Sequence, residues 1–88
     1  MKRYRLLVAW DVVIALRDLP KRVQRGVYEV FGRLEDAPDL VSEFQAADEN
    51  GRQLDGFIFE NHAFYYWIDF ADRHVKILAF GPADDHSR

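Results

Sequence analysis

The sequence predicts a single small α+β domain in which a strand and two helices precede an antiparallel meander of three or four strands. Two observations carry this prediction: an apolar stripe at helical spacing in the first half, and alternating apolar residues between turn signals in the second. Because helices followed by a run of strands are typical of α+β folds, we expect the helices to pack on one face of the sheet.

The first half contains a strand and two helices. Residues 4–10 are β-forming and apolar on both faces, which predicts a buried strand. Asp11 is expected to cap a short first helix, and Pro20 opens a second helix. Gly26 is expected to let another element approach closely, and residues 36–39 end the helix. The apolar stripe of this second helix consists of Val23, Val27, Val30, Phe31 and Leu34.

The second half predicts strands separated by short turns. The expected strands cover residues 40–46, 53–60, 63–70 and 74–80. Asn50-Gly51 is typical of a hairpin turn, Asn61-His62 forms a second tight turn, and Gly81-Pro82 ends the last strand. We expect one domain over residues 1–82 and a disordered polar tail over residues 83–88.

Composition limits the possible function classes. The 88 residues suffice for one modest core, and 49% apolar residues are too many for a disordered chain. Cysteine is absent, which excludes disulfides and thiolate sites and suits a cytoplasmic protein. No segment reaches the roughly 18 apolar residues of a membrane span, so we expect no membrane association.

Charge is distributed unevenly along the chain. Residues 1–33 hold eight Lys and Arg residues against three carboxylates, whereas residues 34–88 hold four against twelve. The basic part could meet an acidic partner or a phosphate backbone. A helix with a solvated charged face would produce the same pattern.

Residues 63–70 give the strongest strand signal. Strand alternation sends Phe64, Tyr66 and Ile68 to one face. Tyr65 and Trp67 point to the other face, where they are covered by the rest of the chain or bind a partner. We expect a partner-binding surface, because so small a domain has little left to cover a second sheet face. A partner helix or a second copy of the chain would fit there.

Several segments together resemble one family of proteins. Residues 4–10 (YRLLVAW) and residues 16–23 (LRDLPKRV) are similar to the first strand and the helix junction of the RelE/ParE toxins of bacterial toxin–antitoxin modules. Residues 34–38 (LEDAP) resemble the end of their second helix. The strands that follow have the order of the family, so the resemblance covers nearly the whole chain.

The resemblance implies a toxin fold and a cognate antitoxin as partner. RelE-like members cleave messenger RNA in the ribosomal decoding site and so inhibit translation, whereas ParE-like members poison DNA gyrase. We therefore expect a RelE-like toxin component, an mRNA interferase with an atypical or degenerate active site. The alternative is a non-catalytic module that inhibits gyrase or binds a partner helix. A homodimer is a further expectation, and no cofactor or metal site is expected.

The basic residues of active RelE-like toxins are largely missing here. The turn that carries an arginine in those toxins contains Ala63, and the end of the last strand reads Pro82-Ala83-Asp84-Asp85. Acidic residues at that place would repel an RNA phosphate backbone. RNA cleavage needs cations beside the attacked phosphate and a group that accepts the 2′-hydroxyl proton.

The remaining polar residues supply the candidate site. For catalysis the candidates are His62, Arg73 and His74, since histidine titrates in the range that proton transfer needs. Solvated turn or strand-end positions are the alternative interpretation of both histidines. The candidates for binding RNA or phosphate are Arg52, Lys76, Lys21, Arg22 and Arg25. The residues predicted to bind a partner are Tyr65 and Trp67.

Overall fold

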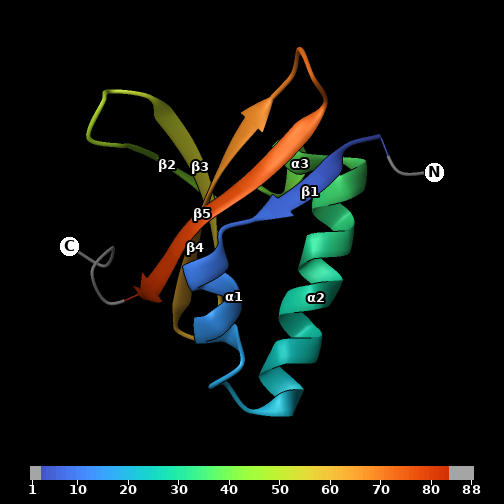
Figure 1. Ribbon diagram of the computed structural model, residues 1–88, viewed down its shortest axis with the longest axis vertical. Coiled ribbons are helices and arrows are strands. Elements are labelled where there is room, and N and C mark those ends of the chain that lie inside the picture. Colours follow the sequence, from blue (N-terminus) through green and yellow to red (C-terminus); the bar gives the residue numbers. More distant parts are fainter. Residues whose placement is uncertain (1–2, 84–88) are drawn as a thin grey trace.

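A mixed five-stranded sheet with helices on one side forms the fold in a computed structural model that describes residues 3–83 (Figure 1). The described elements, in chain order, are β1 (Arg5–Val8), α1 (Trp10–Leu16), α2 (Lys21–Asp36), α3 (Pro38–Val41), β2 (Phe44–Ala47), β3 (Gln53–Phe59), β4 (His62–Asp69) and β5 (His74–Pro82). The predicted α+β class is confirmed.

The strands lie in the order β1-β5-β4-β3-β2. Strands β2 to β5 form the predicted antiparallel meander. The first strand joins it at the far edge, where β1 pairs in parallel with β5 and Leu6 lies opposite Val75. Chain order did not predict this neighbour, because three helices and the strands β2 to β4 lie between β1 and β5 in the sequence.

Helix α2 provides one wall of the core with its predicted apolar stripe. All five residues of the stripe are at most 5% exposed. They pack against the buried side chains of the sheet, which are Phe57, Phe64, Tyr66, Ile68, Val75 and Ile77. Gly26 allows a close approach, as expected, because the ring of Phe59 occupies the space that a Cβ would take.

Helix boundaries differ from the prediction at two places. Strand β1 ends at Val8 and α1 already begins at Trp10, so Asp11 lies inside the first turn rather than at the cap position. Its carboxylate accepts a hydrogen bond from the N–H of Val12. Residues 40–41 belong to the short helix α3 and not to a strand, because Pro38 starts a new helical turn.

The turn between β3 and β4 also differs from the prediction. It consists of Glu60 and Asn61, whose φ angles are 45° and 69°. Two consecutive positive φ values are those of a type I′ hairpin turn. His62 is consequently the first residue of β4 and not a turn residue. Strand β5 continues through Gly81 to Pro82.

Tyr66 connects the sheet to α3. Its side chain is completely buried, and its hydroxyl donates a hydrogen bond to the carbonyl oxygen of Pro38 at 2.8 Å. Burial, followed by the negative charge of Asp55, raises the pKa of the phenol. The hydroxyl therefore stays a donor and holds α3 against β4.

The structure describes only part of the predicted domain and of the predicted tail. Residues 84–88 of the predicted polar tail lie outside the described residues, as do residues 1–2 of the predicted domain. Within residues 3–83, no helix is long and apolar enough to span a membrane.

Candidate functional site

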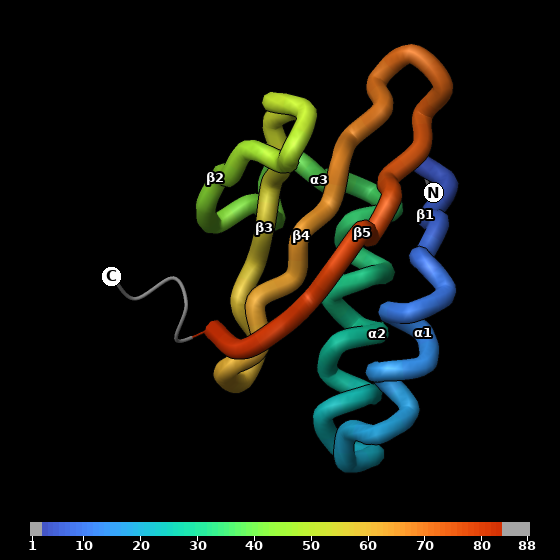
Figure 2. Tube along the Cα trace, turned by 60° about the vertical axis from the view of Figure 1, so that its left-hand side comes forward, coloured from blue at the N-terminus to red at the C-terminus, as the bar shows by residue number. Residues whose placement is uncertain are grey.

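The candidate site lies on the sheet face opposite the helices, which we call the open face. Figure 2 shows α1 and α2 on one side of the strands. Strand alternation places Phe64, Tyr66 and Ile68 on the helix side, where they are at most 8% exposed. The intervening residues Tyr65 and Trp67 are half-buried on the open face, as predicted. The register adds further residues to that face: Arg5, Leu7, Phe44, Leu54, Asp69, His74 and Lys76.

Trp67 lies between two cations. Lys76 is its direct neighbour across the β4–β5 pairing, and the Lys76 Nζ is 5.0 Å from the centre of the indole ring. The Arg52 guanidinium carbon lies 4.9 Å from the same ring. Asp48 holds Arg52 in place, because the Arg52 Nε donates a hydrogen bond to the Asp48 carboxylate at 3.0 Å. The structure thus brings together two predicted phosphate-binding residues and one predicted partner-binding residue.

Apolar residues form the surface beside this cluster. Tyr65 meets Phe44 of β2 edge-to-face, with 5.6 Å between the ring centres. Leu54 lies between these strands and is only 7% exposed, although it is on the open face. An amphipathic surface of this kind can hold planar groups by stacking and charged groups by the flanking cations.

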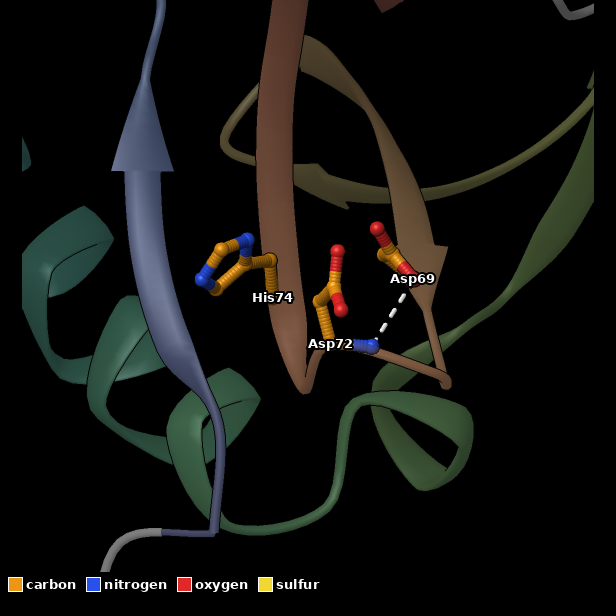
Figure 3. Close-up of side chains that lie close together, drawn as sticks. All are labelled: Asp69, Asp72 and His74. Carbon is orange, nitrogen blue, oxygen red and sulfur yellow. Dashed lines mark hydrogen bonds between the residues drawn. The ribbon is translucent and has the colours of Figure 1, made fainter.

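An imidazole and two carboxylates meet at the end of the β4–β5 hairpin (Figure 3). His74 lies opposite Asp69, and ligand atoms of His74, Asp69 and Asp72 are all within 4.8 Å of one another. Asp69 also accepts a hydrogen bond from the N–H of Asp72. These three groups could orient a proton-accepting imidazole or hold a cation. Sequence analysis did not group them, because only the hairpin pairing brings positions 69 and 74 together.

Arg73 lies beside this cluster and at the edge of the open face. It adopts a left-handed conformation with φ of 59°, and its guanidinium lies 5.8 Å from the centre of the Tyr4 ring. The surrounding depression of about 640 Å³ is lined mainly by charged residues: Arg3, Arg5, Glu35, Asp72 and His74. Arg73 and His74 are therefore neighbours in space as well as in sequence.

Comparison with solved structures identifies the fold. The chain matches the archaeal RelE–RelB complex from Pyrococcus horikoshii OT3 with a TM-score of 0.78 and 25% identity, over 92% of this chain and 96% of that chain. The chain has a RelE-like toxin fold. No protein-family model and no curated protein matches the sequence.

Two further structures support the RelE-like fold. The toxin–antitoxin complex RelBE2 from Mycobacterium tuberculosis matches with a TM-score of 0.75 and 23% identity, over 91% of this chain and 98% of that chain. A mutant of the E. coli toxin RelE in the free state, with two arginines replaced by alanine, matches with a TM-score of 0.70. The identity is 12%, over 97% of this chain and 87% of that chain.

His62 lies at the other end of the RelE-like sheet. It pairs with Phe59 and Pro82, and its Nδ1 is 2.9 Å from the carbonyl oxygen of Glu60. His62 lies seven positions before Asp69 at the opposite end of β4, which corresponds to roughly 23 Å at about 3.3 Å per residue. The structure therefore does not bring His62 together with Arg73 and His74.

The basic residues of α2 are also remote from the open face. Lys21, Arg22 and Arg25 are exposed on the first turns of this helix, which covers the opposite face of the RelE-like sheet. Arg22 is paired with Glu60, with 2.7 Å between Nη1 and Oε2. These residues form a separate basic surface and do not join Arg52 and Lys76.

Ala63 occupies the position at which the resemblance implies an arginine. It is completely buried and lies between Ile58 and Gly81 in the sheet. A buried methyl group leaves no cation at this point of the open face. Asp84 and Asp85, which the sequence analysis expected to repel RNA, lie outside the described residues.

Proposed function

We propose that the chain is the toxin component of a toxin–antitoxin pair and that its open face binds single-stranded RNA. The RelE-like fold supports the first part. The observation that carries the second part is the position of Trp67 between Arg52 and Lys76. A base can stack on an aromatic ring, and the adjoining cations can hold the phosphates on either side of that base.

The proposed reaction is cleavage of messenger RNA, which would inhibit translation. The 2′-oxygen of one nucleotide attacks the adjacent phosphorus and forms a 2′,3′-cyclic phosphate. The bond to the 5′-oxygen of the next nucleotide breaks, and this oxygen takes up a proton from water. In this proposal His74 accepts the 2′-hydroxyl proton, and Asp69 orients the imidazole. Lys76, two residues along the same strand face, stabilises the charge that grows on the phosphate oxygens.

A binding function without cleavage is the second candidate. Ala63 favours it, because the position at which the resemblance implies an arginine holds no charge. In this case the open face would bind RNA or a partner protein and would leave the phosphodiester bonds intact. Gyrase inhibition belongs to this candidate.

The proposed partner is a cognate antitoxin. The P. horikoshii and M. tuberculosis structures are complexes of a toxin with its antitoxin. For this chain we propose that a partner encoded beside it binds the free toxin and that the pair is present in the cytoplasm.

The test measures binding and cleavage separately. A fluorescent single-stranded RNA of about 12 nucleotides is titrated with the free protein, and the same RNA is then analysed for cleavage with and without ribosomes. Lys76→Gln is expected to weaken RNA binding. It is also expected to reduce the slope of the logarithm of affinity against the logarithm of salt concentration by about one, because one phosphate contact is lost. Lys21→Gln on the opposite face is the matched control and is expected to change neither.

The outcomes distinguish the candidates. Cleaved RNA and inhibited in vitro translation would support the interferase. Binding without cleavage would support the second candidate, with a supercoiling assay to test gyrase. Normal translation in excess free protein, together with no RNA binding, would contradict both RNA functions.

A further inference from the structure

The end of the β4–β5 hairpin carries three side chains of the types that bind metal ions. Asp69 is the last residue of β4, His74 is the first residue of β5, and Asp72 lies in the turn between them. Figure 3 shows the three side chains close together beside this turn, and their ligand atoms all lie within 4.8 Å of one another. All three ligands come from residues 69–74, so little chain entropy is lost when they close around an ion.

The backbone of the hairpin fixes these side chains relative to one another. Asp69 and His74 are partners in the β4–β5 pairing, which places their side chains next to each other on one face of the sheet. The N–H of Asp72 donates a hydrogen bond to Oδ1 of Asp69 at 3.1 Å and so holds the turn against the end of β4. The ligand set is therefore largely arranged before an ion binds.

Lone pairs of all three side chains are available to an ion. Within residues 3–83, nothing donates a hydrogen bond to the His74 imidazole, to the Asp72 carboxylate or to Oδ2 of Asp69. Asp69 and His74 are half-buried and Asp72 is exposed, so an ion can enter from solvent. Two ligands that are each about 2.1 Å from a tetrahedral ion lie roughly 3.4 Å apart. Small side-chain rotations are thus enough to bring the three groups onto one ion.

The imidazole determines which class of ion suits this set. Mg²⁺ and Ca²⁺ take oxygen ligands, and two carboxylates offer them few. Zn²⁺ and the neighbouring divalent transition metals bind imidazole nitrogen together with carboxylate oxygen. Nearby positive charge strengthens this preference, because Arg5 lies opposite His74 in the β1–β5 pairing and Arg73 precedes it in the chain. These arginines disfavour an ion held by charge alone, whereas a bond to the imidazole nitrogen is directional.

We propose that Asp69, Asp72 and His74 bind a divalent transition-metal ion and that Zn²⁺ fits the site best. Three protein ligands leave one position of a tetrahedral Zn²⁺ for water. A metal-bound imidazole has no lone pair left to accept a proton, so Zn²⁺ would block the proton acceptor of the proposed RNA cleavage. This consequence rests on the proposed function, whereas the metal site itself does not.

Metal binding is tested on the full chain without RNA. Bound metal is first removed with EDTA, and ZnCl₂ is then titrated into the protein by isothermal titration calorimetry. One equivalent of Zn²⁺ is expected to bind. In NMR spectra the imidazole resonances of His74 are expected to shift on binding, whereas those of His62 stay in place. A large excess of MgCl₂ is expected not to displace the Zn²⁺.

Substitutions of single ligands are expected to weaken Zn²⁺ binding at least tenfold. His74→Ala removes the nitrogen ligand, and Asp72→Asn removes the charge of one carboxylate. His62→Ala at the other end of the sheet and Asp18→Asn, an exposed carboxylate between α1 and α2, are the matched controls and are expected to bind like the wild type. His86→Ala, outside the described residues, is expected to do the same. Thermal melting of each variant establishes that it is folded.

The proposal would be overturned if no Zn²⁺ binds, if His74→Ala binds Zn²⁺ as tightly as the wild type, or if Mg²⁺ displaces it. Unshifted His74 resonances in the Zn²⁺-saturated wild type would contradict it without any substitution.

The RNA cleavage assay is run in parallel with metal-free and Zn²⁺-saturated protein. Zn²⁺ is expected to stop cleavage, and cleavage at an unchanged rate would contradict the competition for His74. Absence of cleavage in both samples contradicts the proposed interferase, whereas the calorimetric titration alone decides whether the metal site exists.

Discussion

The two faces of β4 and β5 differ although the same strands form both. On the helix side Phe64, Tyr66 and Ile77 are completely buried and pack into the core. On the open side Tyr65 and Trp67 are only half-buried, and the cations of Arg52 and Lys76 lie near the ring of Trp67. Alternation along one strand thus separates residues that stabilise the fold from residues that are available for binding.

This difference shows how a small domain can present a binding surface without weakening its core. The aromatic rings of the helix side stack on one another, with Phe64 between Phe57 and Phe80 at 4.8 Å from each ring centre. The indole of Trp67 has no such ring partner among the described contacts. We therefore expect substitutions on the helix side to lower stability and substitutions on the open side to lower binding.

Phe64→Ala is expected to have the largest effect. Removal of a completely buried ring that stacks on two others should lower the free energy of unfolding by about 3–5 kcal/mol. Urea denaturation followed by circular dichroism measures this loss. A loss no larger than that of Trp67→Ala would contradict the distinction between the two faces.

Trp67→Ala is expected to affect binding more than stability. Loss of the stacking surface should weaken single-stranded RNA binding by about 1–3 kcal/mol. Fluorescence anisotropy measures the affinity, and denaturation of the same variant measures the accompanying change in stability. Unchanged RNA affinity would show that the open face is not the RNA site.

Tyr66→Phe is expected to have a smaller effect, on stability alone. The substitution keeps the buried ring but removes the hydrogen bond to the carbonyl of Pro38, which should cost about 1 kcal/mol. Tyr28→Phe, at a tyrosine that is 52% exposed, is the control. Equal unfolding free energies for the two variants would show that the bond between β4 and α3 contributes nothing.

Asp48→Asn is expected to show the smallest effect, in its pH dependence. Burial acts to raise the pKa of Asp48, but hydrogen bonds from Arg52 and from the N–H of Asn50 outweigh it, so the pKa is lowered. Its contribution to stability is then present above the unfolded value of about 3.9 and is lost as the pH falls through the folded value.

Thermal unfolding at pH 6 and at pH 3 measures this dependence. The wild type should melt above Asp48→Asn at pH 6, and the difference should narrow at pH 3. A constant difference in melting temperature between the two pH values would mean that the ionised form of Asp48 does not stabilise the fold.

Local patterns in the sequence predicted the features that depend on residues close together in the chain. The stripe from Val23 to Leu34 predicted the buried side of α2, and alternation predicted the two faces of β4. Boundaries were less predictable where two signals compete. Residues 40–41 have apolar side chains that suit a strand, but the helical turn begun by Pro38 includes them.

The site depended on pairings between distant segments. Trp67 and Lys76 meet because β4 and β5 pair in one register, and Arg52 joins them from the start of β3. Arg52 and Lys76 were candidates for phosphate binding and Trp67 for partner binding, and nothing local connected the three residues. His62 shows the reverse, since its chemistry suggested catalysis but the pairing placed it at the far end of the sheet.

The parallel pairing of β1 with β5 has a consequence for synthesis. Leu6 finds its partner Val75 only after all the residues between them have been made, so β5 must leave the ribosome before the sheet can be completed. Closing so long a loop also slows folding relative to the local α1–α2 contacts. The open face is therefore assembled last, because Lys76 and His74 belong to the strand that arrives last.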